Sequence, residues 1–215
     1  MAKYSIAVTG GIGSGKSFAS DIIKSLGYQT FSCDEIAKNM YDDENLKSAV
    51  IKLFGEKILD SNGNIFKKTL ADIVFSDKAA LKKLNDLTHP YIVKTLFDNI
   101  KKASGVVVSE VPVLFESGLQ NDFDEVFIIK RDLKSRIDSV VKRSAMTEEA
   151  VTARINSQFD YETGLPALIK ESEARLKSGL FSPVYTIIYN NGDSSSLRAS
   201  LISALSKVKE KLKQR

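Results

Sequence analysis

Cysteine and long apolar runs are almost absent from this chain of 215 residues. Its single cysteine, Cys33, cannot form a disulfide within the chain, so the reducing cytoplasm is the expected compartment. No run reaches the roughly 18 consecutive apolar residues of a membrane-spanning helix, so we expect no membrane partner. Because the N-terminus leads directly into a strand-like run, we also expect no signal peptide.

The chain also lacks internal repeats, low-complexity segments and a strong excess of charge of either sign. Its formal net charge of +4 suits anionic small molecules and gives no argument for a nucleic-acid partner. The lysines near the C-terminus are typical of a solvated helix end with cations at its negative dipole terminus. Hydrophobic residues make up 43%, which excludes a disordered chain and allows one core domain with an inserted lobe.

The sequence does contain a phosphate-loop motif, Gly-Gly-Ile-Gly-Ser-Gly-Lys-Ser at residues 10–17. It fits the pattern G-x-x-x-x-G-K-[ST] between an apolar run and the helical stretch Phe18–Leu26, which is the context that the motif needs. A chance Lys-Ser pair in a glycine-rich turn would not explain this agreement. Glycines let backbone amides turn toward an anion, Lys16 brings a cation to the outer phosphates, and the Ser17 hydroxyl can ligate Mg²⁺. The predicted nucleoside triphosphate site is Gly11, Ile12, Gly13, Ser14, Gly15, Lys16 and Ser17.

Strand-like and helical runs alternate along the chain, which predicts an α/β fold with a parallel sheet covered on both faces. The predicted strands are Ser5–Thr9, Tyr28–Phe31, Val106–Glu110, Glu125–Lys130 and Tyr185–Tyr189. About seventy residues between the second and third strands are almost entirely helical in pattern. An insertion at this point would lie over the carboxyl edge of the sheet, where ligands bind in open α/β folds. Its predicted helices are Asp34–Tyr41, Glu44–Phe54, Lys67–Phe75 and Lys78–Ala103.

A second helical stretch, with predicted helices Leu133–Arg143 and Glu148–Gln158, follows the fourth strand. We interpret it as a mobile flap, because its arginines could grip phosphate oxygens bidentately, although solvation explains any one of them alone. After it the signals are weaker, and only a short helix at Glu171–Lys177 is expected, with prolines and a glycine as breaks. The arginines in question are Arg131, Arg136, Arg143 and Arg154.

Acidic residues at the ends of strands are candidates for chemistry beside the phosphates. Asp34 follows the second strand and could orient an attacking hydroxyl or hold a metal-bound water, or it could simply cap the next helix. A free aspartate titrates at about 4, so orienting the hydroxyl matters more here than strong basicity. Glu110 ends the third strand in the position of a Walker-B acid, and Glu116 is its rival; either could be an ordinary surface carboxylate.

His89 is the chain's one histidine, and it stands beside Pro90 in an otherwise helical stretch. A proline removes a helix hydrogen bond, so this pair is expected to interrupt the helix, with a kink as the simple explanation. A histidine in such a place is more often a hydrogen-bonded structural group than a catalyst. The pair therefore decides nothing by itself.

Taken together, the residues resemble the dephospho-CoA kinase family over nearly the whole chain. The phosphate loop alone would indicate only the superfamily. The specific part is Leu84-Asn85 with His89-Pro90, followed by Pro112-Val113-Leu114-Phe115-Glu116, in order and at fitting spacing. The other matches are residues 9–17, Asp34, Phe54-Gly55, Asn62-Gly63, Leu70, Val74-Phe75, Val111, Arg143, Gln158 and Asn190-Asn191-Gly192.

This resemblance implies transfer of the ATP γ-phosphoryl group to the 3′-hydroxyl of dephospho-CoA, the last step of coenzyme A biosynthesis, with Mg²⁺. It also implies a three-layer P-loop NTPase core with a five-stranded parallel sheet (residues 1–33 and 104–215), a lid at about 133–165, and a helical acceptor-binding insertion (residues 34–103). The implied catalytic residues are Asp34 as general base, Lys16, and Arg143 from the lid. Asn190 and Gly192 join the ATP site, and Ser17 with Glu110 forms the metal site. The implied acceptor-binding residues are Asp34, Lys67, Lys68, His89, Pro112, Leu114 and Glu116.

The chain departs from the family pattern in places. Only the last acid remains in Ser32-Cys33-Asp34, and Ser139 stands where an arginine is usual, four residues before Arg143. Arg136, one turn earlier, is a candidate replacement. The alternatives are another small-molecule or nucleotide kinase, a nucleotide-dependent switch, which would usually carry Asn-Lys-x-Asp, and an ATP-binding homologue with weakened turnover. We expect a monomer or a weak homo-oligomer.

Overall fold

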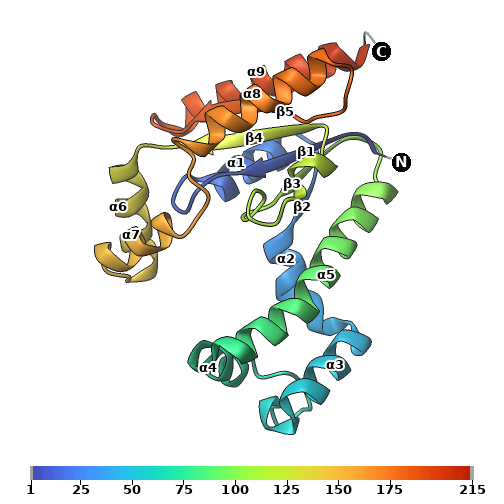
Figure 1. The fold of residues 1–215 in the computed structure, drawn as a ribbon, viewed down its shortest axis with the longest axis vertical. Helices are drawn as coiled ribbons and strands as arrows, with labels where there is room; N and C mark the ends of the chain where they lie inside the picture. The colour runs from blue at the N-terminus through green and yellow to red at the C-terminus, as the bar shows by residue number, and fades with distance from the viewer. Residues whose placement is uncertain (1, 214–215) are drawn as a thin grey trace. The chain divides into compact units, whose positions relative to one another are not determined.

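The computed structural model describes residues 2–213, and strands and helices alternate along them (Figure 1). The strands are β1 (Ala2–Thr9), β2 (Gln29–Ser32), β3 (Gly105–Glu110), β4 (Glu125–Lys130) and β5 (Val184–Tyr189). The α-helices are α1 (Lys16–Ser25), α2 (Cys33–Asn39), α3 (Glu44–Phe54), α4 (Lys67–Ser76), α5 (Lys78–Lys102), α6 (Leu133–Ser144), α7 (Glu148–Asn156), α8 (Gly164–Lys177) and α9 (Ser194–Lys213). Short 3₁₀ turns lie at Met40–Asp42, Glu56–Ile58 and Leu119–Asp122.

The five strands form one sheet in the order β2-β3-β1-β4-β5. The pairs β1–β3, β1–β4 and β4–β5 are parallel, and the register sets Val8 opposite Glu110 and Thr9 opposite Ile128. The carboxyl ends of β1, β3 and β4 therefore meet at one edge, where β1 continues into the phosphate loop. The predicted α/β fold with a five-stranded parallel sheet is confirmed.

Helices α1 and α9 cover one face of this sheet. Tyr4, Ile6 and Val8 alternate along β1 and all belong to the same buried cluster, as the two-residue period of a strand requires. The helices contribute apolar residues at helical spacing, among them Ile23 from α1 and Leu201 from α9, each fully buried. This packing fixes the start of α1, and with it the end of the phosphate loop.

The chain separates into two compact units. The first runs up to Phe31 and resumes at Lys102, and it contains the sheet. The second, Ser32–Lys101, is helical and has its own core. Its Asn62-Gly63 turn is held by Asp60, whose Oδ1 accepts from the amides of Asn62 (2.8 Å) and Asn64 (2.9 Å). That this unit binds an acceptor stays a prediction. The buried residues of its core are Val50, Ile58, Ile65, Leu70, Val74 and Ala80.

Two of the helices contain a proline. Helix α8 begins at Gly164, so the prediction of a short helix from Glu171 was wrong. Pro166 lies in its first turn, where backbone N–H groups have no helical partner in any case, and so the proline does not break the helix. Helix α5 runs from Lys78 to Lys102, which confirms the predicted helix Lys78–Ala103 to within one residue, and the His89-Pro90 pair within it does not end the helix.

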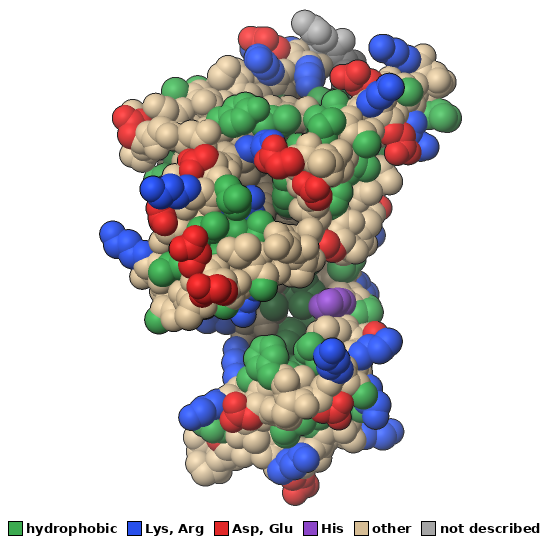
Figure 2. Space-filling model, turned by 60° about the vertical axis from the view of Figure 1, so that its left-hand side comes forward, with side chains coloured by type: hydrophobic (Ala, Val, Ile, Leu, Met, Phe, Trp, Pro, Cys, Tyr) green, Lys and Arg blue, Asp and Glu red, His purple; other side chains and the backbone are tan. Residues whose placement is uncertain are grey.

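The surface carries charges of both signs. On the face drawn in Figure 2, acidic and basic side chains are interspersed, without one large patch of a single sign, as a net charge of +4 on 215 residues leads one to expect. None of the described helices, within residues 2–213, is long and apolar enough to cross a membrane.

Glu125 anchors the opposite, amino edge of the sheet. It is 2% exposed, and its carboxylate accepts from the Tyr4 hydroxyl (3.0 Å), the Thr186 hydroxyl (2.6 Å) and the Lys211 ammonium (3.2 Å). These partners come from β1, β5 and α9. One buried side chain therefore joins three strands and the C-terminal helix.

Replacing Glu125 by alanine should lower the free energy of unfolding by about 2–4 kcal/mol, because buried hydrogen bonds to a charged group are lost. The half-exposed Lys211 can return to water, which keeps the loss toward the lower end. Urea unfolding followed by circular dichroism measures it. Glu44→Gln, which breaks an exposed pair with Lys47, is the control and should cost less than about 0.5 kcal/mol. Equal losses in the two variants would contradict the assignment.

Candidate active site

The phosphate loop connects β1 to α1. Helix α1 begins at Lys16, and its N-cap residue, Gly15, has φ of 90° and no side chain that could accept from the first-turn amides. No cap side chain competes with an anion for these amides, and the positive end of the helix dipole favours an anion there. The local chemistry is what the motif predicts.

The glycines of the loop are also required by close packing. A Cβ at Gly11 would lie under 3.0 Å from the Arg136 guanidinium, and one at Gly15 equally close to the Asn190 amide group. At Gly13, where φ is +78°, a Cβ would meet the backbone carbonyl of Arg136. Sequence reasoning assigned these glycines to the anion alone, because the packing partners lie more than a hundred residues away.

The substitution Gly13→Ala should weaken ATP binding by at least about tenfold, since a backbone carbonyl cannot move aside as a flexible side chain can. Calorimetric titration of ATP measures the affinity. The matched control is Gly27→Ala, because Gly27 also has a positive φ (+86°) but no atom within 4 Å of the position that a Cβ would take. The control carries the cost of backbone strain without the clash and should keep its ATP affinity. Equal affinities for the two variants would disprove the packing argument.

Ser17 and Glu110 meet at the carboxyl edge of the sheet. The Ser17 hydroxyl donates to Glu110 Oε1 at 2.6 Å, and Glu110 ends β3 with only 6% of its surface exposed. Hydroxyl and carboxylate oxygens are the ligands that a hard divalent cation prefers. Within residues 2–213 no group of three or more His, Cys, Asp or Glu side chains could hold a metal, so further ligands would have to be phosphate and water oxygens.

Glu116, the rival of Glu110, lies elsewhere in the first unit. Its Oε1 accepts from the backbone amide of Phe159 at 2.9 Å, so it fixes the segment that follows α7. It does not pair with Ser17. The structure therefore brings Glu110, and not Glu116, to Ser17, the serine of the motif.

Two side chains hold the peptide groups of Ile12: Arg136 from α6, and Gln158 from the segment after α7. The Ile12 amide donates to Gln158 Oε1 (2.8 Å), and Arg136 Nε donates to the Ile12 carbonyl (2.9 Å). A third contact comes from Asn190, whose Nδ2 donates to the Ser14 carbonyl at 2.9 Å. Sequence reasoning missed this role of Gln158, and the family resemblance was the only signal that marked it.

Tyr161 packs beside the end of β1, where the phosphate loop begins. It is 7% exposed, and its hydroxyl lies 3.5 Å from Thr9 Oγ1 at the end of β1. Burial raises the pKa of Tyr161 to about 12, so the phenol stays protonated at neutral pH. Its ring packs edge-on against Phe159, with centroids 5.2 Å apart, and Phe159 stacks on Phe115 at 4.4 Å. Nothing in the local sequence pattern identified this aromatic support.

Known proteins were compared with the chain by sequence. A family model described as dephospho-CoA kinase matches residues 4–166. The chain belongs to the dephospho-CoA kinase family. A dephospho-CoA kinase of Fusobacterium nucleatum is 35% identical over 158 residues, which cover 73% of this chain and 82% of the relative. One of Geobacillus kaustophilus is 31% identical over 205 residues, covering 93% and 94%.

Solved structures agree with membership of the dephospho-CoA kinase family. The dephospho-CoA kinase from Campylobacter jejuni superposes with a TM-score of 0.65 at 27% identity, covering 96% of this chain and 97% of the other. TT1252 from Thermus thermophilus gives 0.71 at 27% identity, covering 96% and 98%. A gluconokinase from Sinorhizobium meliloti, at 14% identity and a TM-score of 0.50, shares the fold alone.

Asp34, the general base implied by the dephospho-CoA kinase resemblance, lies in the first turn of α2. The cap of that helix is Ser32, whose hydroxyl accepts from the Glu35 amide at 3.4 Å, so the alternative that Asp34 is the capping residue was wrong. Asp34 is exposed, and the helix dipole favours its negative charge in the first turn. Its catalytic role stays a prediction.

The other residues that the dephospho-CoA kinase resemblance assigned to the acceptor fall in both units. In the helical unit, Lys67 Nζ donates to the Lys38 carbonyl at 2.6 Å, while Lys68 and His89 are exposed. In the sheet unit, Pro112 is half-buried, Glu116 accepts from the Phe159 amide, and Leu114 is fully buried in the core. Their roles in acceptor binding stay predictions.

Arg136, one of the arginines after β4, contacts the phosphate loop. Arg143, the lid arginine of the dephospho-CoA kinase pattern, is exposed in the last turn of α6, and its role stays a prediction. Ser139, where the family pattern has arginine, accepts a hydrogen bond of 2.7 Å from Arg131 Nη1. A guanidinium is therefore directed at this position from the end of β4.

Proposed function

We propose that the protein transfers the γ-phosphoryl group of ATP to the 3′-hydroxyl of dephospho-CoA, giving coenzyme A and ADP. The observation that carries this proposal is the family match over residues 4–166. The phosphate loop supports it, because its glycines, Lys16 and Ser17 follow β1 in the arrangement that a triphosphate needs. We propose that the helical unit, residues 32–101, binds the acceptor.

Each proposed role follows from what phosphoryl transfer requires, which is mainly positioning and stabilisation of charge. The loop amides hold the triphosphate, and Lys16 balances the charge that develops on the transferring group. Asp34 orients the attacking hydroxyl and accepts its proton late in the reaction. Arg143 approaches the phosphates from the lid.

The residues at the carboxyl edge fit a Mg²⁺ ion. The Ser17 hydroxyl hydrogen is directed to Glu110 at 2.6 Å, which leaves the lone pairs of the hydroxyl oxygen for a metal. Ser17 would be the direct ligand of the metal. Glu110 would accept the hydrogen bond from the Ser17 hydroxyl and add a negative charge near the metal. When bound, Mg²⁺ neutralises charge on the β- and γ-phosphate oxygens.

The substitution Glu110→Gln should raise the Mg²⁺ concentration needed for half-maximal activity by about tenfold or more. The glutamine carbonyl can still accept from Ser17, so the hydroxyl stays in place while the charge beside the metal is lost. Initial rates at saturating ATP across a Mg²⁺ series measure this. Glu116→Gln is the control for loss of one carboxylate and should keep its Mg²⁺ dependence. An unchanged requirement in Glu110→Gln would remove Glu110 from the metal site.

The function is tested by incubating the protein with ATP, Mg²⁺ and dephospho-CoA and analysing the product by ³¹P NMR and mass spectrometry. We expect one added phosphate, located on the ribose 3′-oxygen, and one ADP for each phosphate transferred. Parallel reactions with a nucleoside monophosphate, gluconate and shikimate test for another small-molecule kinase. Faster turnover with one of these acceptors, or ADP release that does not depend on acceptor, would overturn the proposal.

A further inference from the structure

A cavity of about 510 Å³ lies beside the phosphate loop, within the first unit. It is bounded by the start of α6, the end of α7 and the segment 158–162. Two of its lining residues, Arg136 and Gln158, are those that hold the peptide groups of Ile12. The cavity is thus directly connected to the loop. Its charged lining residues are Arg131, Asp132, Arg136, Asp160 and Glu162.

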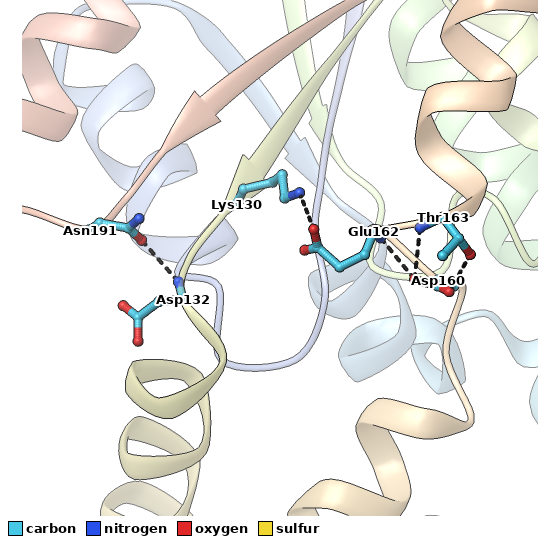
Figure 3. Close-up of polar contacts among 6 residues, drawn as sticks. All are labelled: Lys130, Asp132, Asp160, Glu162, Thr163 and Asn191. Atoms are coloured by element: carbon cyan, nitrogen blue, oxygen red, sulfur yellow. Dashed lines mark hydrogen bonds and ion pairs between the residues drawn. The ribbon is translucent and has the colours of Figure 1, made fainter.

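The acidic side chains of the lining are all held by hydrogen bonds or an ion pair, and Figure 3 shows the contacts of Asp160 and Glu162. Asp132 caps α6 by accepting from the Ser135 amide at 2.8 Å. Asp160 accepts from the Glu162 amide (2.8 Å) and from Thr163, and Glu162 pairs with Lys130 at 2.9 Å. The hydrogen bonds to Asp132 and Asp160 lower the pKa of each carboxyl group, so both stay ionised and bound in their turns.

The guanidinium groups of Arg131 and Arg136 donate to neutral oxygens, those of the Ser139 hydroxyl and the Ile12 carbonyl. Among the described residues, no ion pair within 4.0 Å joins Arg131 or Arg136 to a carboxylate. Arg131 Nη1 donates to the Ser139 hydroxyl. The buried Nε of Arg131 has no hydrogen-bond partner in the part of the chain that the structure describes. Burial lowers the pKa of Arg136, while Tyr161 and the more distant Glu162 charge oppose this. Asp132 and Glu162 act on these two partly buried cations electrostatically, but a direct ion pair would stabilise the cations further, and an anion that enters the cavity could make one.

We propose that Arg131 and Arg136 form a seat for a phosphate-type anion in this cavity, and that its occupant is the outer phosphate end of the bound nucleotide. Guanidinium groups bind phosphate oxygens bidentately, and both of these still have N–H donors to offer. Arg136 joins the seat to the loop, because the same side chain holds the Ile12 carbonyl. The identity of the occupant rests on the proposed function; the seat itself does not.

Calorimetric titration of the full chain with inorganic pyrophosphate, ATP and AMP tests the seat. Arg131→Met and Arg136→Met should each weaken binding of pyrophosphate and ATP by about tenfold to a hundredfold, with AMP changed by less than about threefold. Arg136→Lys can still reach the Ile12 carbonyl but lacks the planar fork, so it should give an intermediate loss. It also keeps the test open if Arg136→Met fails to fold, which urea unfolding reports.

Two control variants test whether weaker binding could come from a disturbed structure or from the loss of any one positive charge. Ser139→Ala removes the hydrogen bond to Arg131 but keeps the guanidinium, and it should bind pyrophosphate within about threefold of the wild type. Lys134→Met removes one exposed positive charge from α6, the helix that contains Arg136, and should bind pyrophosphate as well as the wild type does. If Arg131→Met binds pyrophosphate no more weakly than Lys134→Met, Arg131 is not part of an anion seat.

The occupant is identified by repeating the pyrophosphate titration in the presence of a saturating non-hydrolysable ATP analogue. Loss of pyrophosphate binding shows that the nucleotide phosphates occupy the seat. Pyrophosphate binding that persists and still depends on Arg131 shows a separate anion, which overturns the nucleotide assignment. These readouts need no acceptor, so the seat can fail while dephospho-CoA is phosphorylated, and it can stand if dephospho-CoA is not the acceptor.

Discussion

The substitution Lys16→Ala should lower kcat/KM for ATP by at least about a hundredfold, or roughly 3 kcal/mol of transition-state stabilisation. Lys16 is the first residue of α1 and directly follows Gly15, the last glycine of the phosphate loop. In phosphoryl transfer the charge develops on the oxygens of the transferring group, and a cation placed there stabilises the transition state. Steady-state rates at varied ATP, with the coupled release of ADP as signal, measure the change.

Lys24→Ala is the matched control for Lys16→Ala, because both residues lie in α1 and the variants lose the same charge. Lys24 is exposed in the last turn of that helix, at the opposite end from the loop. Its loss should cost under about 1 kcal/mol of stability through the helix dipole and leave kcat/KM unchanged. A Lys16→Ala enzyme with wild-type kcat/KM would remove Lys16 from the mechanism.

The sequence predicted those features that local patterns determine. The phosphate loop lies in a continuous motif, and the bounds of β4 and α3 were predicted without error because apolar periodicity and flanking turn residues mark them. For the carboxylate that lies next to Ser17, the sequence left two candidates. Local pattern could not choose between Glu110 and Glu116, because the choice depends on how β3 pairs with β1.

The features that were missed depend on distant contacts or on the position of a residue within a turn. Arg136 and Ile12 are 124 residues apart, and Asn190 and Ser14 are 176 apart, so no local periodicity records that these pairs meet. Helix α8 was predicted too short because Pro166 was interpreted as a break. The first turn of a helix tolerates proline, and the fully buried Leu165 next to it supplies the tertiary contact that fixes this start.

The substitution Asp34→Asn should lower kcat by at least about a hundredfold and leave the KM for ATP within about twofold. The asparagine keeps the size of the side chain but removes the acceptor for the proton of the attacking hydroxyl. Helix α2 should remain intact, because its cap is the Ser32 hydroxyl and not Asp34. The loop that holds ATP belongs to the other unit of the chain, so nucleotide binding should not change. Single-turnover rates at saturating dephospho-CoA separate the chemical step from binding.

Glu35→Gln is the control that makes the Asp34→Asn result decisive. Glu35 is the next residue of the same first turn and is also exposed, so each variant removes one negative charge from the same end of α2. In both variants the free energy of unfolding should fall by the same few tenths of a kcal/mol, because a favourable interaction with the helix dipole is lost. Only Asp34→Asn should lose turnover, since the role argued for Asp34 depends on its position and not on charge near the helix. Equal kcat values for the two variants would show that the carboxylate after β2 serves the helix alone.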